Sequence, residues 1–432
     1  MAGKLNIFQK TLLQWNTMYP YNAVHLVRVP LHLDKVRLTH SINSQLENCG
    51  LTGLSIDDRK GAFHYYGGPA LSEIKVVQGE KDPRAVLREE TEEQLNMPFT
   101  GKAPMNPFRF FAVQEENAFY LGLVYFHVIA GAESIVFLLK RIVNSYMDKD
   151  APGLSLPLSL YPRGYFHHFK IKPKPLLGWL STLPSFISEL RKSFRPPYTD
   201  RGDQSVGVSF FSLEPDRFHA LVRSGKRWGV TLNDIFLALL LKAISPFAQD
   251  RKHASRRKMI SVASIVNIRR DLDLDMQTIF GVFLGSFIVS HAVPEGIRIE
   301  DLVRDIHRQT DRIKKYQLYI RTTIGLALAQ LLIPLFSPLR QRSFYPKYYP
   351  LWAGITNINL NVLWKHGDED IGVDYFRAVS TGPVSPLVFS ITTVNDVLNI
   401  GVSFKTSVFS QEDVDKVIAT FLNSIDTLRV SA

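Results

Sequence analysis

The chain has 432 residues, of which 45% are hydrophobic and 21% charged, and its formal net charge is +11. This length predicts about two domains, and the composition excludes collagen-like, mucin-like and wholly disordered chains. The positive charge favours acidic partners such as a phosphorylated cofactor, anionic lipid or an acidic carrier protein. Nucleic acid is not expected as a partner, because the basic residues are dispersed and no nucleic-acid-binding motif occurs.

The single cysteine, Cys49, excludes an intramolecular disulfide and a zinc site built from cysteines, and it fits a reducing compartment. The first twenty residues lack the apolar segment and the small-residue cleavage site of a signal peptide. We therefore expect a cytoplasmic protein, and no pattern in the sequence predicts a metal site.

Strands and helices are both predicted in the first half of the chain. The predicted strands cover residues 22–33, 62–66, 72–78, 108–114 and 119–128. Pro30 is expected to break the first of these strands or to displace it to a sheet edge. A helix is predicted over 34–49, with Asp34 as its cap and Gly50 as its stop. A second helix over 83–96 carries a run of charges that is expected to face water.

A proline-rich region over 148–204 indicates the crossing between two lobes. Its segment 175–195 is apolar first and basic afterwards, which suits either a membrane surface or packing against the protein body, and packing is favoured. His167 and His168 are adjacent on an extended segment, so they point to opposite faces and make a poor metal pair.

The second half repeats the same plan. Strands are predicted near 205–212, 258–267, 280–290, 354–363, 371–379, 386–394 and 397–405. Helices are predicted from Pro215 to near Gly225, over 235–244, 299–319 and 411–428, and Thr231 and Asp234 resemble a capping box. The apolar run over 323–339 is too short and too interrupted by proline to span a bilayer. Each half is therefore expected to form an α/β sandwich.

His127 stands out because it is the only strongly polar side chain near the end of the apolar strand 119–128. A rigid strand can hold an imidazole in a cleft, where it suits proton transfer. The alternative is a buried histidine bonded to a backbone carbonyl. Ser134 follows at the position of an N-cap for the next helix.

Three segments, taken in order, resemble the condensation-domain-like acyltransferase superfamily, which includes chloramphenicol acetyltransferases and wax ester synthases. They are the run from Trp15 to Asn22, the run from Phe126 to Ser134, and a final region comprising 229–244, Val266 to Arg270 and Gly281. The resemblance implies two chloramphenicol-acetyltransferase-like α/β lobes in a pseudo-dimer, with the site at their interface. The implied divisions are 1–180, a crossover over 181–204, and 205–432.

The family pattern His-His-x-x-x-Asp-Gly matches this chain only in part. His127 aligns with the second histidine, which in the family receives or positions the proton of the attacking acceptor. Phe126 replaces the first histidine, Gly131 the aspartate and Ala132 the glycine. The family's aspartate braces the loop through a salt bridge, so we expect its arginine partner to be replaced or another carboxylate, Glu133, to serve.

The resemblance implies an acyltransferase that moves an acyl group from a thioester of coenzyme A or of an acyl carrier protein to an alcohol or amine. Such an enzyme would serve lipid or secondary-metabolite biosynthesis and hold no permanent cofactor. Transfer would be direct, because no serine or cysteine shows a nucleophile signature. The apolar-basic segments 175–195 and 323–347 lead us to expect a lipophilic acceptor and peripheral membrane contact.

Ser134, Asn357 and Asn359 are candidate substrate-binding residues that could donate hydrogen bonds to an oxyanion, and their alternative roles are an N-cap and ordinary strand positions. A second function is also open. The altered motif suits a protein of this fold that binds a lipid or carrier-borne intermediate without transfer, or one that performs cyclisation or hydrolysis in the same cleft.

Overall fold

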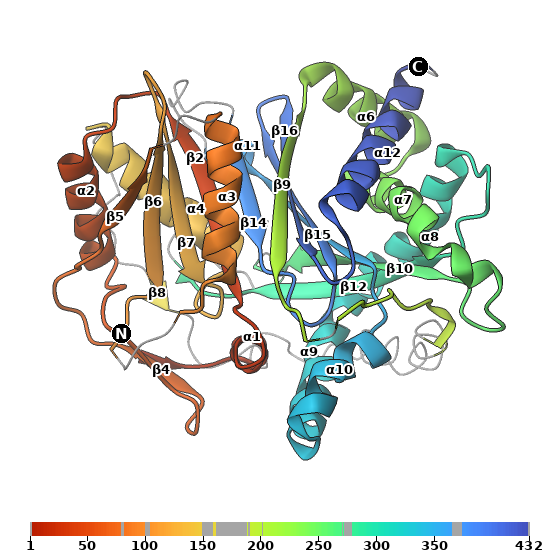
Figure 1. Ribbon diagram of the computed structural model, residues 1–432, viewed down its shortest axis with the longest axis horizontal. Helices are drawn as coiled ribbons and strands as arrows, with labels where there is room; N and C mark the ends of the chain where they lie inside the picture. The colour runs from red at the N-terminus through yellow and green to blue at the C-terminus, as the bar shows by residue number, and fades with distance from the viewer. Residues whose placement is uncertain are drawn as a thin grey trace.

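Two large sheets stand side by side, each with its own covering helices (Figure 1). The computed structural model describes residues 2–78, 82–99, 104–148, 159–160, 188, 191–200, 202–269, 271, 279–364 and 374–430. His167, His168 and most of 175–195 lie outside these residues, and so do 181–187, 189, 190 and 201 of the predicted crossover 181–204. The exact division of the chain into lobes therefore stays a prediction.

The N-terminal lobe is built on a five-stranded sheet with the order β14-β2-β7-β6-β5. Its strands are β2 (Asn22–Val29), β5 (Ile74–Val77), β6 (Phe108–Gln114), β7 (Phe119–Phe126) and β14 (Tyr375–Val379). Every residue of β7 is buried, because helices cover both faces of the sheet. Helices α2 (Lys35–Asn48) and α4 (Ala132–Tyr146) pack on one face, and α3 (Pro83–Asn96) packs on the other.

The strand β14 comes from the C-terminal part of the chain and pairs antiparallel with β2, with Tyr375 opposite Val27. The two alternatives predicted for Pro30 have different outcomes: a break in the strand is confirmed, and displacement of the strand to the sheet edge is wrong. The strand β2 ends at Val29, directly before the proline, and it lies inside the sheet because β14 occupies the edge. A division of the chain at one position therefore does not separate the two sheets, because β14 belongs to the sheet of the N-terminal lobe.

The charged run of α3 meets water at Glu89 and Glu93 as predicted, but the prediction is wrong for Glu90, because this helix lies between the two sheets (Figure 1). Its Glu90 is 4% exposed and forms an ion pair with Lys75 at 2.7 Å. Its Asn96 bonds to both backbone polar groups of Val206 in β9 (Val206–Leu213), at 2.8 and 2.9 Å. The helix thereby joins the two lobes.

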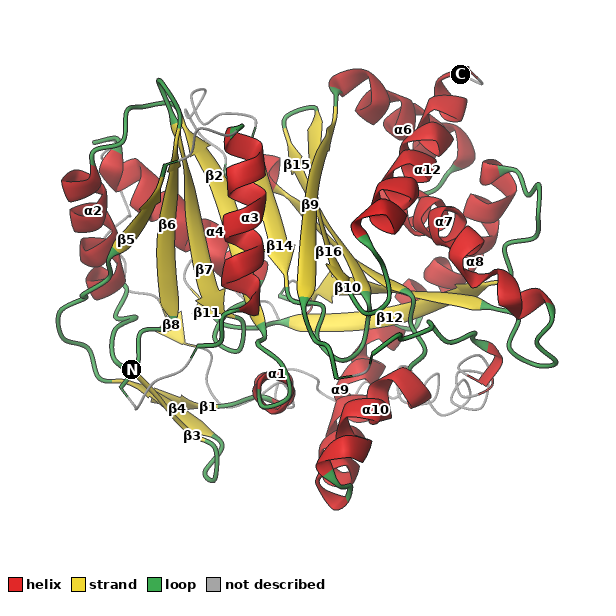
Figure 2. Ribbon diagram, viewed as in Figure 1, coloured by secondary structure: helices red, strands yellow, loops and turns green. Residues whose placement is uncertain are grey.

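The C-terminal lobe is built on a six-stranded sheet with the order β12-β10-β13-β15-β16-β9. Its further strands are β10 (Ile260–Asn267), β12 (Leu284–His291), β13 (Ala353–Asn359), β15 (Leu387–Val394) and β16 (Val397–Lys405). The helices gathered on its outer side in Figure 2 are α6 (Pro215–Trp228), α7 (Leu232–Ile244), α8 (Ile299–Lys315) and α12 (Gln411–Val430).

The helix α7 forms the centre of this lobe, and the predicted capping box of Thr231 and Asp234 begins it. Its apolar residues are almost all buried, which explains a sequence that is apolar nearly all round. The stretch Leu232–Lys252 is long and apolar enough to cross a membrane, but 61% of its apolar 18-residue window is buried inside the protein. We therefore assign α7 to the core.

Further helices and short strands complete the described part of the chain. They are α1 (Ile7–Asn16), α9 (Arg321–Leu332), α10 (Pro338–Tyr348), α11 (Leu360–Leu363), the 3-10 helices η2 (Ser245–Lys252), η4 (Leu318–Ile320) and η5 (Ile333–Leu335), and the short strands β1 (Ala2–Lys4), β3 (Leu54–Asp57), β4 (Ala62–Tyr65), β8 (Ser159–Leu160) and β11 (Ile279–Phe280). The helices α9 and α10 project from the body below the junction (Figure 2).

Candidate active site between the lobes

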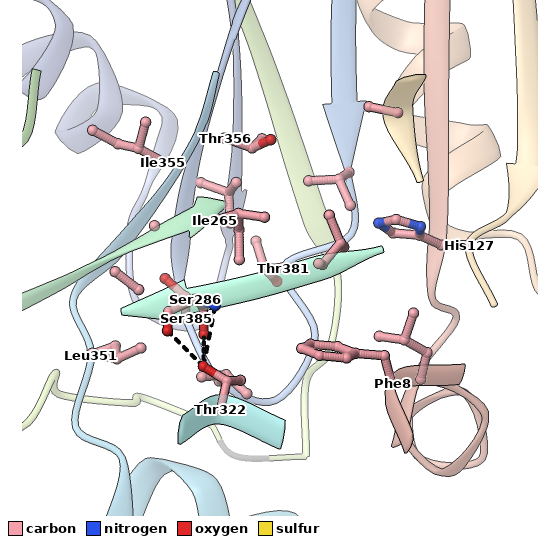
Figure 3. A pocket seen from close by; sticks show the side chains of 18 of the residues that line it. Phe8, His127, Ile265, Ser286, Thr322, Leu351, Ile355, Thr356, Thr381 and Ser385 are labelled. Carbon is pink, nitrogen blue, oxygen red and sulfur yellow. Dashed lines mark hydrogen bonds between the residues drawn. The ribbon is translucent and has the colours of Figure 1, made fainter. Parts of the chain in front are cut away.

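A cavity of about 370 Å³ lies between the two lobes and receives side chains from both of them. The N-terminal lobe contributes residues around the ends of β2 and β7, and the C-terminal lobe contributes β10, β12, β13 and β15. Helices α1 and α9 close one end. Figure 3 shows the ring of His127 reaching into this cavity from one side, with Thr356 and Ile265 on another.

His127 lies directly after β7 and is held by contacts on several sides. Its Nδ1 lies 2.9 Å from the carbonyl oxygen of Ala130. A carbonyl only accepts, so Nδ1 carries the proton and Nε2 is left as the acceptor. Tyr21 stacks on the ring with 5.4 Å between centroids, and Tyr125 packs edge-on at 5.5 Å. These contacts fix one tautomer and one orientation.

The electrostatic setting keeps this imidazole neutral. Burial lowers the pKa of His127 below its ordinary value of 6.5, the Ala130 carbonyl opposes this shift, and the charge of Arg377 adds to it. The ring lies deep in the protein, but His127 is only half-buried and lines the cavity. A neutral imidazole with a free Nε2 can accept a proton from a hydroxyl or amine.

A second histidine, His25 on β2, lines the same cavity. Its Nδ1 is 2.6 Å from the hydroxyl of Tyr375 on β14, and its ring packs edge-on against Tyr125 at 5.7 Å. Burial, followed by the charge of Arg377, holds the pKa of His25 well below its ordinary value. The cavity therefore contains two neutral imidazoles, on the adjacent strands β2 and β7 or at their ends.

The rest of the cavity is chiefly apolar. Apolar residues of β12, β13, α9 and the neighbouring 3-10 helix line it, and they include Leu284, Phe287, Leu318, Leu326 and Ile355. An apolar body inserted there would leave water and contribute roughly 25 cal/mol for each Å² buried. The cavity thus suits a substrate with a hydrophobic portion.

The three predicted substrate-binding residues lie in different places. Asn357 on β13 lines the cavity, which is the position required for contact with a substrate. Asn359 instead caps α11, where its side chain accepts from the backbone N–H of Asn361 at 2.9 Å. Ser134 is buried, and the cavity lining does not include it.

Ser134 was expected as the N-cap of α4, and this expectation is wrong. Gly131 is the N-cap, so the helix begins at Ala132 and places Ser134 within its first turn. The Ser134 hydroxyl donates to the carbonyl of Gly281 at 3.2 Å and accepts from the N–H of the same residue at 3.1 Å. Arg269 also donates to this hydroxyl, at 2.5 Å. The serine therefore joins the loop to the other lobe.

These contacts also show how the loop is held without the family's aspartate. The N–H of Gly131 donates to the carbonyl of Gly281 at 3.0 Å, beside the Ser134 contacts. The expectation that Glu133 replaces the missing carboxylate in a salt bridge is wrong, because its Oε1 accepts from Asn267 at 2.8 Å and it forms no ion pair with a described residue. Phe126 is buried against Phe99 and does not line the cavity.

The sequence interpretation missed Tyr21, His25, Tyr125 and Arg377, all of which line the cavity. The alternation of β2 placed His25 on one face of a strand, but nothing local showed that this face meets a cavity. Within the described ranges, no group of three or more histidine, cysteine, aspartate or glutamate side chains is arranged to hold a metal ion.

No family model matches the sequence, and no curated protein matches it. Solved structures do match over nearly the whole chain. The first condensation domain of the calcium-dependent antibiotic synthetase, solved with a substrate analogue, is 12% identical with a TM-score of 0.67, covering 99% of this chain and 97% of that one.

Two further similar structures are named for cyclization and for epimerization. The cyclization-docking bidomain of EpoB from Sorangium cellulosum is 13% identical with a TM-score of 0.68, covering 99% of this chain and 84% of that one. The epimerization domain from the third module of tyrocidine synthetase B is 12% identical with a TM-score of 0.62, covering 100% and 97%. The chain has a condensation-domain-like fold, and the predicted two-lobed, chloramphenicol-acetyltransferase-like architecture is confirmed.

Proposed function

We propose that this protein is an acyltransferase in which His127 accepts the proton of an alcohol or amine as that group attacks an acyl thioester. The observation that carries the proposal is the neutral, oriented imidazole at the cavity between the lobes, whose Nδ1 is bonded to Ala130 and whose Nε2 is left to accept. The similar structures support transfer of acyl or peptidyl groups, because condensation domains are among them.

The acyl donor is proposed to be a thioester on an acyl carrier protein or on coenzyme A, both of which are acidic. The net charge of +11 suits either partner. The acceptor is proposed to be lipophilic, because the cavity wall is dominated by aliphatic and aromatic side chains. Attack by the acceptor on the thioester carbonyl forms the new ester or amide bond and releases the thiol, which takes up a proton.

The test is His127→Ala assayed with acyl-coenzyme A and acyl carrier protein donors against a panel of alcohols and amines. Loss of a general base is expected to lower kcat by about two orders of magnitude or more. The matched control is His64→Ala, which removes an exposed histidine on β4 away from the cavity. Full activity in His127→Ala would remove the proposed role.

The second candidate is a protein that binds acyl intermediates without transferring them, and the replacement of the motif by Phe126, Gly131 and Ala132 motivates it. The hydrogen bonds of the Gly131 N–H and the Ser134 hydroxyl to the Gly281 carbonyl favour the enzyme, because the loop that holds His127 keeps a defined geometry. Mass spectrometry of the same reactions distinguishes the two. Bound donor without any acylated product across the panel would favour the binding protein.

A further inference from the structure

Arg377 on β14 is a cavity-lining cation that is 3% exposed. Its Nε donates to the hydroxyl of Thr392 at 2.9 Å, and its Nη2 donates to the carbonyls of Thr356 and Ile391 at 3.0 and 2.6 Å. Among the side chains that the structure describes, its Nη1 has only the hydroxyl of Thr356 as a partner, at the long distance of 3.5 Å. Every one of these acceptors is neutral.

No described carboxylate lies within ion-pair distance of this guanidinium. The charge of Glu133 raises the pKa of Arg377, but its carboxylate is bonded to Asn267. Burial is the dominant influence and lowers the pKa of Arg377. A cation held in a cavity wall with incomplete charge compensation is costly, and that cost falls when an anionic ligand binds beside it.

The serine Ser390 on β15 supplies a second unsatisfied group at the same wall. It lies opposite Thr356 in the parallel pairing of β13 and β15, and it shares a sheet face with Thr392 two residues on. Ser390 is 1% exposed and lines the cavity, and its hydroxyl has no hydrogen-bond partner in the described part of the chain. A buried hydroxyl of this kind is normally bonded, so it is available to a ligand.

We propose that Arg377, Thr356 and Ser390 form a subsite for the carboxylate of a substrate whose remaining body is apolar. Nη1 and the Ser390 hydroxyl would donate to the two carboxylate oxygens, and the hydrophobic remainder would occupy the apolar wall formed by residues such as Ile265 and Val388. One cation matches a single negative charge, whereas a phosphate group carries nearly two.

This subsite deepens the proposed function, on which its role in catalysis rests. Arg377 and His127 line the same cavity, so the carboxylate would bind in the cavity that contains the proposed base. An acceptor tethered through its own carboxyl as a thioester has no free carboxylate to offer. The structure therefore favours an acceptor that diffuses in as a free hydroxy or amino acid with an apolar body.

The test is isothermal titration of the full chain with octanoate, octanamide and octyl phosphate. Octanoate is expected to bind at least about tenfold more tightly than octanamide, because a charge-assisted bond is lost with the amide. In Arg377→Met the two ligands should bind equally. Ser390→Ala should weaken octanoate binding several-fold, and it removes no existing hydrogen bond of the described structure.

Thr392→Val is the matched control, because Thr392 bonds to Arg377 but does not line the cavity. It should keep the preference for octanoate even if the protein becomes less stable. Equal binding of octanoate and octanamide by the unaltered protein overturns the proposal. The proposal is also overturned if the single variants Ser390→Ala and Arg377→Met both keep the preference for octanoate over octanamide unchanged. Tighter binding of octyl phosphate than of octanoate overturns the assignment to a carboxylate.

His127→Ala separates this proposal from the acyltransferase proposal. The variant should retain octanoate binding within about threefold, because His127 is neutral and contributes no charge to the subsite. If octanoate binds as expected while no acyl transfer is found, the proposed function fails and the subsite stands. If acyl transfer occurs while octanoate shows no preference, the subsite fails alone.

Discussion

The side chain of His127 is the residue on which the proposed chemistry depends, and its surroundings make a prediction about pH. The neutral ring is the base, so activity is lost as the ring becomes protonated on acidification. Burial lowers the pKa of His127 below 6.5, which moves that loss to lower pH. The acid limb of kcat/KM is therefore expected to have its midpoint below pH 6.5. A midpoint at or above 6.5 would contradict this assignment.

Lys405 at the end of β16 gives a prediction about stability. It is 3% exposed, its Nζ lies 4.4 Å from the ring centroid of Tyr19, and it donates to Gln204. Burial lowers the pKa of Lys405 from 10.5 to about 8. Between pH 8 and 10.5 the unfolded chain binds more protons at this residue than the folded chain, so the folded state gains stability as the pH rises.

Below pH 8 the cost of the buried charge is constant and is on the order of 3 kcal/mol before its contacts are counted. Comparison with Lys405→Met isolates this contribution, because the other titrating groups are shared. Chemical unfolding at several pH values should show the stability of the unaltered protein rising relative to the variant between pH 8 and 10.5. A constant difference across that interval would show that the lysine titrates normally.

At the scale of elements, the strands β14 and β16 cross very closely. A Cβ added at Gly401 would lie 1.9 Å from the backbone oxygen of Arg377, so no side chain fits there. Gly401→Ala must separate the strands and is expected to destabilise the fold by about 2–3 kcal/mol, with loss of the cavity geometry. Urea unfolding measures the change.

Gly354→Ala on β13 is the control for this prediction. Its added Cβ would meet only the hydroxyl oxygen of Ser385, at an ordinary 3.8 Å. We expect a change within about 0.5 kcal/mol. Equal stability of the Gly401→Ala and Gly354→Ala variants would show that the two sheets do not depend on this close approach.

Element-level prediction from sequence succeeded where the signal was local. Asp34 caps α2 by accepting from the backbone N–H of Arg37 at 3.0 Å, and Gly50 follows that helix with a left-handed φ of 65°. The predicted strands 386–394 and 397–405 are present as β15 and β16, which pair antiparallel across a turn at Asn395. Each of these depends on a few neighbouring residues, and the chain needs no distant partner to specify them.

At the scale of the whole molecule, the projecting pair α9 and α10 links the cavity to the surface. One part of α9 lines the cavity through Leu326 and Ala329. Beyond it, Leu331 and Leu335 are 71% and 78% exposed. Arg340, in the first turn of α10 that follows Leu335, is exposed as well. We propose that this tip binds an anionic membrane from which a lipophilic substrate enters.

Sedimentation with vesicles containing phosphatidylserine tests this binding. The unaltered protein should bind, binding should weaken as salt rises, and Leu331→Ser with Leu335→Ser should weaken it several-fold. The control is Val36→Ser with Leu71→Ser, which removes residues that are 80% and 84% exposed elsewhere on the N-terminal lobe. Equal losses in the two double variants, or no binding at all, would contradict a specific membrane contact.

The sequence by itself determined the local elements and the position of His127 at the end of a buried strand, because hydrophobic periodicity, caps and turns are written in adjacent residues. Only the tertiary structure decided which faces meet at the cavity. His25 and Arg377 lie opposite one another and both line the cavity because β14 pairs with β2 across about 350 residues of chain. Such pairing depends on the packing of distant strands, and no local pattern encodes it.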